Sequence, residues 1–397
     1  LFFIILNICV LMKNKIHKYD FLIVGAGLIG SIAALALHKN NFKVLVIDKE
    51  KKIIPDKRTL AVNANSREFL IDLGIWGKLK SKPQSIEKII ISDYINHKPI
   101  IFENNSEAMG DVIFNYEMVQ IVRAKLKKLN ILKTDININF NNIQPNKTTV
   151  IGKNVYKFKK IIISIGKNNN LNPSHRSIKF DQGHNSFVGF FGHYKNHQNF
   201  AYEIFNPDGP LAILPSPSNY KNKSTFIYTT KKKIFPNEIK LLIKKNFKKS
   251  HGQINFEKSI YKFPIKPNLT KDNKDFIYIG DSLKSIHPVA GQGWNLGIKD
   301  IQKLIKLSKN YSIDDKIFNS IYYSNRIFES SLYLGFTSLL NFLYENIITI
   351  AANVPSKFPK ISKYWKDLLG ITRCDNSENN DNAIRKIKTF LKLVSFK

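Results

Sequence analysis

Apolar positions along the chain follow two patterns that predict two kinds of structure. Four short runs are mostly apolar, which is typical of strands buried on both faces of a parallel sheet. These runs cover residues 19–24, 44–47, 159–166 and 276–280. Amphipathic helices are predicted after the first run, over residues 117–129, and from about Asn295 onwards. Strands that alternate with helices predict an α/β core.

The middle of the chain has the pattern of antiparallel β structure. Residues 85–102 alternate as a hairpin does, and residues 186–230 contain three segments of strand length. The sequence NPDG at residues 206–209 is a turn signature between two of these segments. Further predicted elements are a basic helix at residues 237–248, a strand at 262–265 and long helices over 318–350. We therefore predict a β-rich insertion in the α/β core, followed by a helical region.

The sequence GAGLIG at residues 25–30 joins the first apolar run to the first helix. In that position Gly25 makes a tight turn, Gly27 lets a pyrophosphate approach the backbone, and Gly30 lets the helix pack on the strand. Asp48 ends the second run, 23 residues after Gly25, where a carboxylate is suited to bind ribose hydroxyls. The combination predicts a site for FAD or NAD(P), and Asp48 argues against a 2′-phosphate there.

The stretch IGDSLKSIHPVAGQGWNLGIKD begins at the fourth apolar run and places a carboxylate and glycines before a helix. Asp281 follows the run, Pro288 holds a turn, and Gly291 and Gly293 precede the helix. Such glycines expose backbone N–H groups at the positive end of a helix, where an anion or an electron-rich carbonyl can dock. Taken alone, the stretch is interpreted either as a ligand site or as a glycine-rich loop between core elements.

Composition adds little to this picture. The chain has 62 Lys and Arg against 30 Asp and Glu, a formal charge of +32, which favours anionic partners. Only seven of the 62 are Arg, however, and specific nucleic-acid readers rely on Arg. The excess of Lys, Asn and Ile is typical of a biased genome, so we predict no nucleic-acid partner. Cys9 and Cys374 fit no metal or redox spacing, which indicates a reducing compartment.

Two features allow two interpretations each. Arg58 is one of few Arg in a chain rich in Lys. Its planar guanidinium is interpreted either as a group that binds a phosphate or as an ordinary surface charge. The first twelve residues, LFFIILNICVLM, are apolar but too short to span a bilayer. They are interpreted as an extension ahead of a start at Met12, and alternatively as a short hydrophobic anchor. Residues 1–18 are accordingly predicted to be an extension or disordered.

Three separated segments together resemble the FAD-dependent aromatic-ring monooxygenases, and within them the ubiquinone-biosynthesis hydroxylase family. They are GAGLIG with Asp48; DKR with SREFLIDLGIW; and FNPDGPLAILP with GDSLKSIHPVAGQGWNLGIKD. The similarity runs from about residue 19 to about residue 340. It implies an α/β (mixed α+β) fold: a Rossmann-like FAD-binding domain of the p-hydroxybenzoate hydroxylase type with an inserted β-rich substrate domain and a helical C-terminus.

The resemblance also implies domain limits. The discontinuous FAD-binding domain would take residues 19–80, 103–175 and 266–315. The substrate domain would take 81–102 and 176–265, and the helical C-terminal region 316–397.

The resemblance assigns roles to single residues. It implies that the GAGLIG glycines and Asp48 hold the ADP half of FAD, and that Arg58 reaches the phosphates or the flavin end. Asp281 would bind the ribityl or pyrophosphate portion. The implied cofactor-binding set is Gly25, Gly27, Gly30, Asp48, Arg58, Asn115, Asp281, Pro288, Gly291, Gly293, Trp294 and Asn295. No side chain is assigned a catalytic role and no metal is expected; His287 is either a structural turn histidine or a catalytic candidate.

The implied function is hydroxylation of the ring of a polyprenylated phenol in ubiquinone biosynthesis, with NADPH or NADH, O₂ and a flavin hydroperoxide. It also implies a cytoplasmic protein at the inner membrane surface, with other quinone-biosynthesis proteins as possible partners. Two departures keep alternatives open: Ile165 stands where the family has Asp, and Lys284 where it has His. The alternatives are a diverged or non-catalytic FAD-binding subunit of a quinone-biosynthesis complex, and another FAD oxidoreductase of this fold.

Overall fold

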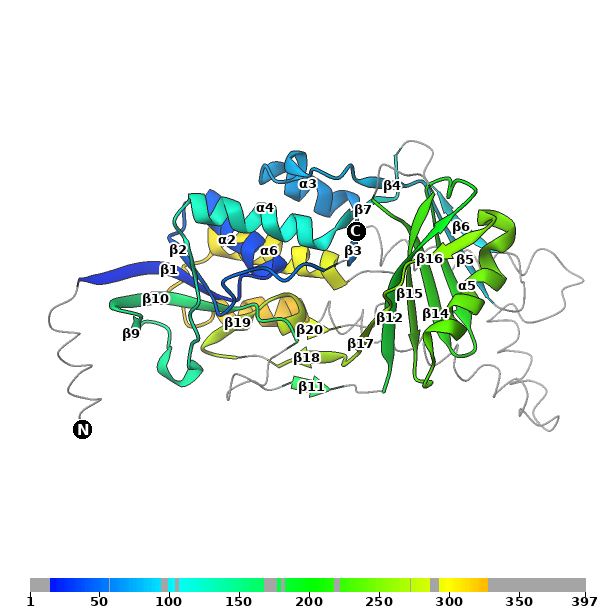
Figure 1. Ribbon diagram of the computed structural model, residues 1–397. Helices are drawn as coiled ribbons and strands as arrows, with labels where there is room; N and C mark the ends of the chain where they lie inside the picture. The colour runs from blue at the N-terminus through cyan, green and yellow to red at the C-terminus, as the bar shows by residue number, and fades with distance from the viewer. Residues whose placement is uncertain are drawn as a thin grey trace, which may run out of the picture.

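The computed structural model shows a molecule in two parts, each built on one large sheet (Figure 1). The structure describes residues 15–56, 58–93, 99–103, 107–167, 177–179, 183–217, 222–271, 273–285 and 293–327. The parallel-sheet part holds the six-stranded sheet and most helices. The large-sheet part holds the eight-stranded sheet and one helix on its outer face.

The six-stranded sheet has the order β19-β10-β1-β2-β8, with all neighbours on this path parallel, and β9 pairs with β10 antiparallel. Its strands are β1 (Ile16–Val24), β2 (Val44–Asp48), β8 (Leu132–Thr134), β9 (Thr148–Ile151), β10 (Asn154–Ile163) and β19 (Phe276–Tyr278). Helices cover the sheet, so the carboxyl-terminal halves of the inner strands are buried on both faces, as their apolar runs predicted. The carboxyl ends of β1, β2 and β10 therefore meet at one edge.

The main helices of this part lie together above the sheet in Figure 1. They are α2 (Leu28–Lys39), α3 (Ala64–Asp72), α4 (Asn115–Lys128) and α6 (Gly293–Asn310). In α2 every residue from Gly30 to Leu37 is buried, because the helix packs on the sheet and contacts α4 and α6. Its small residues, such as Ala33 and Ala34, let these elements approach closely.

The eight-stranded sheet has the order β16-β12-β15-β14-β13-β5-β6, with β17 also paired to β12. Its strands are β5 (Lys88–Asp93), β6 (Ile100–Glu103), β12 (Asn185–His193), β13 (Phe200–Asn206), β14 (Gly209–Pro215), β15 (Lys223–Thr230), β16 (Ile254–Phe256) and β17 (Tyr261–Pro264). All pairs are antiparallel except β5 with β13. The predicted hairpin is β5 with β6, and the NPDG turn joins β13 to β14.

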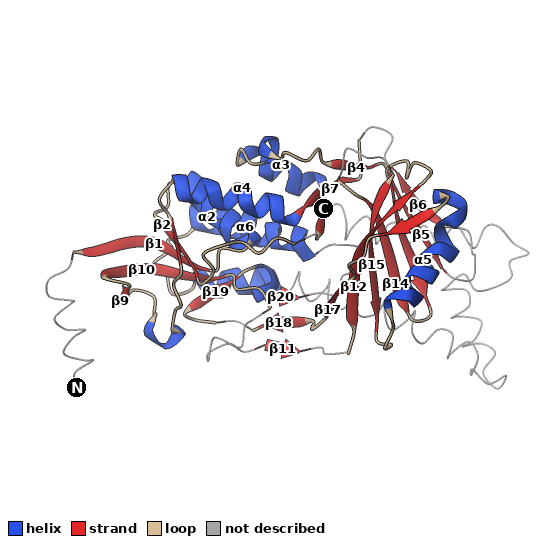
Figure 2. Cartoon of the chain, viewed as in Figure 1, coloured by secondary structure: helices blue, strands red, loops and turns tan. Residues whose placement is uncertain are grey.

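One helix, α5 (Pro236–His251), covers the outer face of this sheet (Figure 2). Its Ile239, Ile243 and Phe247 pack in one cluster with sheet residues such as Phe191 and Phe226. Side chains alternate across a strand, so Leu214 and Ile227 point to the other face, toward the parallel-sheet part. The α/β fold class and its β-rich insertion are confirmed; the domain limits stay a prediction.

Two three-stranded sheets lie between the large ones (Figure 1). The first joins β3 (Thr59–Val62), β7 (Gly110–Phe114) and β4 (Gln84–Ile86), and the second joins β11 (Ser177–Lys179), β18 (Asn268–Thr270) and β20 (Lys284–Ser285). Three short 3₁₀ helices are η1 (Trp76–Lys78), η2 (Phe140–Asn142) and η4 (Gly280–Ser282). Residues 318–327 are helical, as expected for the start of the C-terminal region, whose remainder lies outside the described residues.

Candidate active site

A cavity of about 1020 Å³ opens at the carboxyl ends of β1, β2 and β10. This edge is where ligands bind in open parallel α/β sheets. The glycine turn and Asp48 line one side of the cavity, and Leu214 and Ile227 of the large sheet line another. One space thus connects the predicted nucleotide site to the predicted substrate domain.

The glycines of GAGLIG have three distinct structural roles. Gly25 has φ +103°, and a Cβ there would lie 2.4 Å from the backbone oxygen of Ser164. At Gly30 a Cβ would lie 2.1 Å from the Gly25 oxygen, so larger residues would push α2 off the turn. A Cβ at Gly27, by contrast, would meet no atom within 4 Å. Gly25 and Gly30 are therefore required by close contacts within the protein, whereas Gly27 leaves open space at the cavity wall.

The amino end of α2 is open to the cavity. Its N-cap residue is Gly27, no side chain caps it, and its first turn has no acidic residue. A twelve-residue helix with uncapped N–H groups favours an anion there. Asp48 fixes this turn, since its carboxylate accepts N–H groups from Ala26 at 2.5 Å and from Glu50 at 2.7 Å. The contact with Ala26 is a turn-holding role that the sequence pattern did not reveal.

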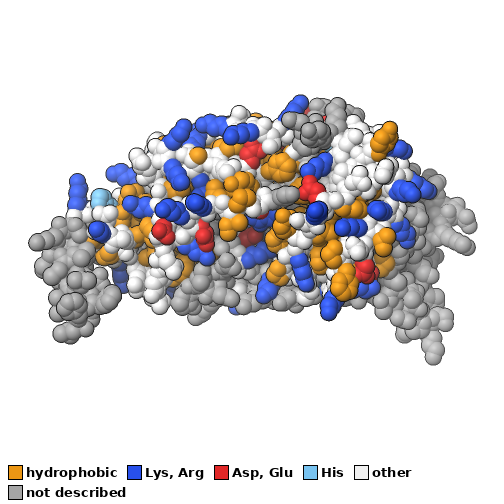
Figure 3. Space-filling model, viewed as in Figure 1, with side chains coloured by type: hydrophobic (Ala, Val, Ile, Leu, Met, Phe, Trp, Pro, Cys, Tyr) orange, Lys and Arg blue, Asp and Glu red, His pale blue; other side chains and the backbone are white. Residues whose placement is uncertain are grey.

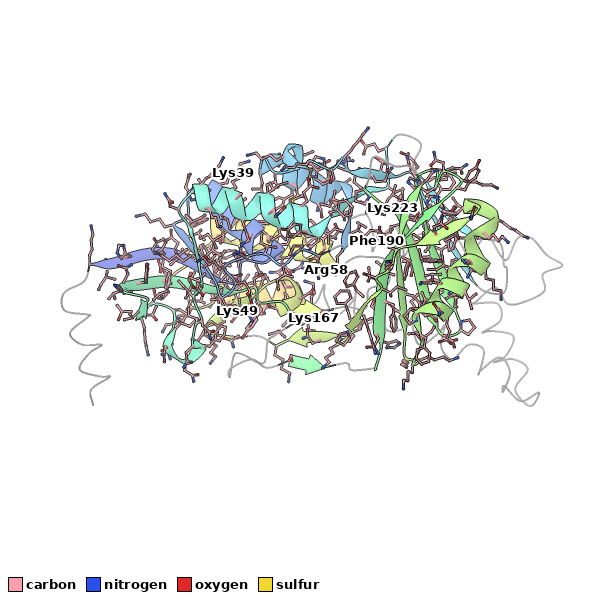
Figure 4. The ribbon with its side chains drawn as sticks, viewed as in Figure 1. Lys39, Lys49, Arg58, Lys167, Phe190 and Lys223 are labelled. Carbon is pink, nitrogen blue, oxygen red and sulfur yellow. The ribbon has the colours of Figure 1, made fainter. Side chains whose placement is uncertain are left out.

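Arg58 and Asn115 both turn toward an acid that the sequence analysis did not assign. The Arg58 Nη2 lies 2.8 Å from Oδ2 of Asp56, and the Asn115 amide donates to the same oxygen at 2.9 Å. The backbone N–H of Asn115 also donates to the Arg58 oxygen. All three residues line the cavity, and Figure 4 shows Arg58 between the two parts of the molecule. The DKR sequence was the available signal for Asp56.

Basic side chains from separate segments surround the same cavity. They are Lys49, Lys52, Arg58, Arg123 and Lys167. Figure 4 shows Arg58 and Lys167 on the side that faces the large sheet, whereas Lys39 lies far away at the other end of α2. Positive charges that converge with an uncapped helix end are suited to a diphosphate.

Asp281 also lines the cavity, where η4 begins. The surrounding protein raises the pKa of its carboxyl by desolvation, while the charges of Lys167 and Arg58 act in the opposite direction. The residue is nevertheless exposed at the cavity wall, where a ligand can donate a hydrogen bond to its carboxylate.

The start of α6 contributes Gly293 and Trp294 to the cavity wall. The indole Nε1 of Trp294 is buried and, among the described residues, has no hydrogen-bond partner. Asn295 does not reach the cavity: its amide donates to the Ala61 oxygen at 2.9 Å and accepts from the Asn63 N–H at 3.2 Å. The side chain thus joins α6 to β3. His287, Pro288 and Gly291 lie outside the described residues, so their predicted roles stay predictions.

A buried ionic cluster behind η4 was not found from the sequence. Asp300, which is fully buried in α6, accepts the Gly280 N–H at 2.9 Å. Its other oxygen lies 2.5 Å from Nζ of Lys284 and 2.8 Å from Nε of Arg326. Lys284, at the position where the resembling family has His, thus pairs with Asp300, which holds the turn preceding Asp281. The scarcity of Arg, used above for Arg58, was a signal that also applied to Arg326.

The helical residues 318–327 hold β19 from behind. The Tyr322 hydroxyl donates to the Tyr278 oxygen at 3.0 Å, and the Tyr323 hydroxyl to the Phe276 oxygen at 2.7 Å. The segment following α6 therefore positions the strand that leads to Asp281.

Ile165 lies at the cavity wall, at the position where the resembling family has an acid. It packs partly on the apolar core of the parallel-sheet part, and Gly166 after it has φ +67° with open space where a Cβ would be. Oγ of Ser282 donates to the Gly166 oxygen at 3.1 Å, which links this turn to η4. These contacts thus hold the turn at Ile165 and Gly166, although the acid of the resembling family is absent there.

These observations fit FAD. The open space at Gly27, the uncapped α2, the unpartnered Trp294 Nε1 and the Asp281 carboxyl at the cavity wall each offer what a dinucleotide with a polar ring system requires.

Comparisons with known proteins agree with this site. An FAD binding domain model matches residues 18–153. The chain is 27% identical to ubiquinone hydroxylase UbiM of Neisseria meningitidis over 315 residues, 72% of this chain and 68% of the relative. It is 24% identical to the mitochondrial ubiquinone biosynthesis monooxygenase COQ6 of Dictyostelium discoideum over 85% of this chain and 87% of the relative. p-Nitrophenol 4-monooxygenase PnpA of Pseudomonas putida shares the fold with a TM-score of 0.69 at 12% identity, over 96% and 99% of the chains.

Fold, site and relatives define the class: the chain is an FAD-dependent monooxygenase. The resemblance to the ubiquinone-biosynthesis hydroxylases that the three motifs indicated is confirmed by these relatives.

Proposed function

We propose that this monooxygenase hydroxylates the aromatic ring of a polyprenylated phenol in ubiquinone biosynthesis, with O₂ as co-substrate and NADPH or NADH as reductant. The observation that carries the proposal is the single cavity that joins the glycine turn to Leu214 and Ile227 of the large sheet. A ring held against these apolar side chains would lie in the same space as the cofactor. Relatives named as ubiquinone hydroxylases support the substrate class.

The protein's own residues bind, orient and exclude water. Gly25, Gly27 and the α2 N–H groups would hold the diphosphate, and Asp281 would accept hydrogen bonds from hydroxyls of the cofactor chain. Trp294 Nε1 would donate to a ring oxygen or nitrogen. When bound, FAD supplies electron transfer and oxygen activation, which no side chain here can provide. The sheet side chains would keep water from the reacting ring.

Peripheral association with the inner membrane, on the cytoplasmic side, is part of this proposal, because a prenylated phenol resides in lipid. Among the described residues, no helix is long and apolar enough to cross a membrane. Contacts with other quinone-biosynthesis proteins would serve to pass on such a substrate.

The test is the visible absorbance of the purified, FAD-loaded protein under anaerobic conditions, before and after NADPH or NADH is added. We expect the flavin band to bleach, and to bleach faster with a prenylphenol present. A bound flavin that is never bleached by either nucleotide would instead favour the non-catalytic subunit. Product analysis after O₂ is admitted then identifies the hydroxylated ring.

A pair of variants tests whether the substrate ring binds at the large-sheet side of the cavity. Ile227→Asn changes a side chain of the cavity wall, and we expect it to raise the phenol concentration needed for half-maximal bleaching at least tenfold, with the FAD spectrum kept. Ile101→Asn, at a 43% exposed position of the same sheet, is the matched control. Equal effects of both substitutions would contradict the proposed position of the substrate.

A further inference from the structure

The outer helix of the large-sheet part has an exposed face dominated by lysine. Residues 231–251, which contain α5, have eight Lys among 21 residues, against 55 among 397 in the whole chain, and a single acid, Glu238. The enrichment therefore exceeds the general lysine excess. On the face seen in Figure 3, basic side chains are spread over both parts of the molecule, so total charge alone does not mark a surface.

Exposed apolar side chains lie among these lysines. Leu241 is 66% exposed, and Phe235, just before the helix, is 65% exposed. Lys244, Lys245 and Lys248 follow Leu241 at spacings of three, four and seven residues, and all are exposed. At these spacings the lysines share one helix face with Leu241.

The orientation of this face is fixed. Ile239, Ile243 and Phe247 on the opposite side are buried against the sheet, so α5 cannot turn Leu241 inward without losing that packing. The Glu238 carboxylate accepts the Phe235 N–H at 2.7 Å and so serves as a helix cap. Within the described residues, Lys244, Lys245 and Lys248 form no ion pair.

The loop after β12 extends the surface at the other end of the helix. Tyr194 is 80% exposed, and its backbone N–H donates to the Gln253 oxygen at 3.0 Å. Nζ of Lys195 donates to the Lys249 oxygen at 3.1 Å, at the last turn of α5. The α5 surface is thus formed by Phe235, Leu241, Tyr194, Lys195, Lys244, Lys245, Lys248 and Lys249.

We propose that the α5 surface docks the enzyme on an anionic lipid membrane. Lysines attract acidic headgroups, and Leu, Phe and Tyr side chains insert at the interface between headgroups and acyl chains. The proposal rests on the proposed function, since a prenylated substrate would come from lipid. What it adds is the surface that contacts the lipid. α5 covers one face of the large sheet, and the other face of that sheet carries Leu214 and Ile227 at the cavity. Membrane and active site would be separated by one sheet.

A nucleic acid fits this surface less well. The exposed aromatics of the surface, Phe235 and Tyr194, lie at opposite ends of the helix, and the aliphatic Leu241 between them cannot stack on bases. The surface also has no Arg for bidentate phosphate contacts. Duplex DNA is therefore a competitor to be measured beside lipid vesicles.

The test uses the full FAD-loaded chain and sedimentation with vesicles of phosphatidylcholine, with or without phosphatidylglycerol. We expect binding only to the anionic vesicles, with the double variant Lys245→Glu/Lys248→Glu losing at least about tenfold in affinity. The matched control is Lys127→Glu/Lys128→Glu on α4 in the parallel-sheet part, which makes the same charge change at exposed positions. Equal losses in the two double variants, or wild-type binding in the α5 variant, would overturn the proposal.

A second pair tests the apolar contribution. Leu241→Ala should weaken vesicle binding several-fold at unchanged charge, whereas Ile71→Ala, at a 52% exposed position on α3, should not. Loss of duplex DNA binding with intact vesicle binding in the α5 variant would assign the surface to nucleic acid. Turnover of a short-chain, water-soluble phenol should be equal in wild type and α5 variants. Failure of that turnover in wild type would refute the proposed function while the vesicle result stands separately.

Discussion

The two large sheets place their functional side chains in different ways. In the parallel sheet, the carboxyl-terminal halves of the inner strands are mostly apolar and buried, and the residues that face the cavity lie at or just after the strand ends: Gly25, Asp48 and Ile165. In the antiparallel sheet, Leu214 and Ile227 lie within strands and reach the cavity from the sheet face. Strand ends tolerate turns with special backbone geometry, whereas a sheet face offers only side-chain shape. The first sheet is therefore suited to a polar cofactor and the second to an apolar ring.

From this difference we expect the stability of the parallel-sheet part to depend on individual buried polar side chains such as Asp300. Asp300→Asn would leave the charges of Lys284 and Arg326 buried without the carboxylate that they share. We expect a loss of about 3–5 kcal/mol in the free energy of unfolding, because a buried charge then lacks compensation. Urea unfolding followed by circular dichroism measures it, with exposed Asp72→Asn as control. A loss below about 1 kcal/mol would show that other groups compensate the charges of Lys284 and Arg326 in the variant.

Substitutions at two glycines of the same turn should have different effects, one on folding and the other on cofactor binding. Gly30→Ala should destabilise the apoprotein by several kcal/mol, since its Cβ would meet the Gly25 oxygen at 2.1 Å. Gly27→Ala meets no atom within 4 Å and has φ −66°, so the apoprotein should unfold at nearly the wild-type temperature. Its FAD affinity should nevertheless fall at least tenfold in a fluorescence titration. If Gly27→Ala binds FAD normally, the diphosphate does not approach the backbone there.

The large-sheet part should be the acid-sensitive one. His251 is buried beside His193 and His197, with ring centroids of His251 and His193 4.7 Å apart. Burial, and then these two neighbours, lower the pKa of His251 to about 4. Because the unfolded chain binds the proton more tightly, this stability is present above about pH 6.5 and is lost as the pH falls toward 4.

At pH 5 the loss from His251 is on the order of 2 kcal/mol relative to pH 7.5. Unfolding monitored across this range should show it, and His251→Gln should flatten the profile although it removes some packing against Phe247. Tyr202→Phe is the control: it changes a ring beside His251 but removes no group that titrates between pH 5 and 7.5, so it should keep the wild-type profile. An unchanged profile in His251→Gln would show that other groups govern the acid response.

The smallest expected effect concerns the cavity carboxylate. Asp281 is exposed at the cavity wall, so its ionised form has little effect on the stability of the apoprotein. Asp281→Asn should therefore leave the melting temperature of the apoprotein within about 1 °C of wild type and weaken FAD binding. Thermal unfolding of the apoprotein and a fluorescence titration with FAD measure the two effects. Unchanged FAD affinity would show that the carboxylate does not contact the cofactor.

The sequence was sufficient for those features that depend on local spacing. GAGLIG with Asp48 predicted a strand, a turn, a helix and a cavity edge because rigid geometry fixes the number of residues between them. The hairpins and α5 were also predicted, since alternation and turn residues are local signals. The faces of the large sheet were not assigned, because the period of two does not say which face meets the cavity.

The remaining site residues could not be predicted for a related reason. Asp300 and Arg326 act through partners distant in sequence, and no spacing rule connects Arg326 to Gly280; Asp56 pairs with nearby Arg58, but its second partner, Asn115, is 59 residues away. Asn295 stays a predicted cofactor-binding residue through its backbone, and its motif did not reveal that its side chain joins α6 to β3. Such pairings depend on the packing of whole elements.

The strand order of the parallel sheet has a consequence for how the enzyme is made. β10 pairs with β19, yet every strand of β12 to β18 is synthesised between them, including most of the large sheet. A chain emerging from the ribosome would hold the glycine turn early, but the strand leading to Asp281 only late. The part of β10 that pairs with β19, Ile161–Ile163, must wait uncovered through that interval, since β9 pairs only with Asn154–Lys157. Binding of the cofactor, which is predicted to contact both the glycine turn and Asp281, would then mark the completion of folding.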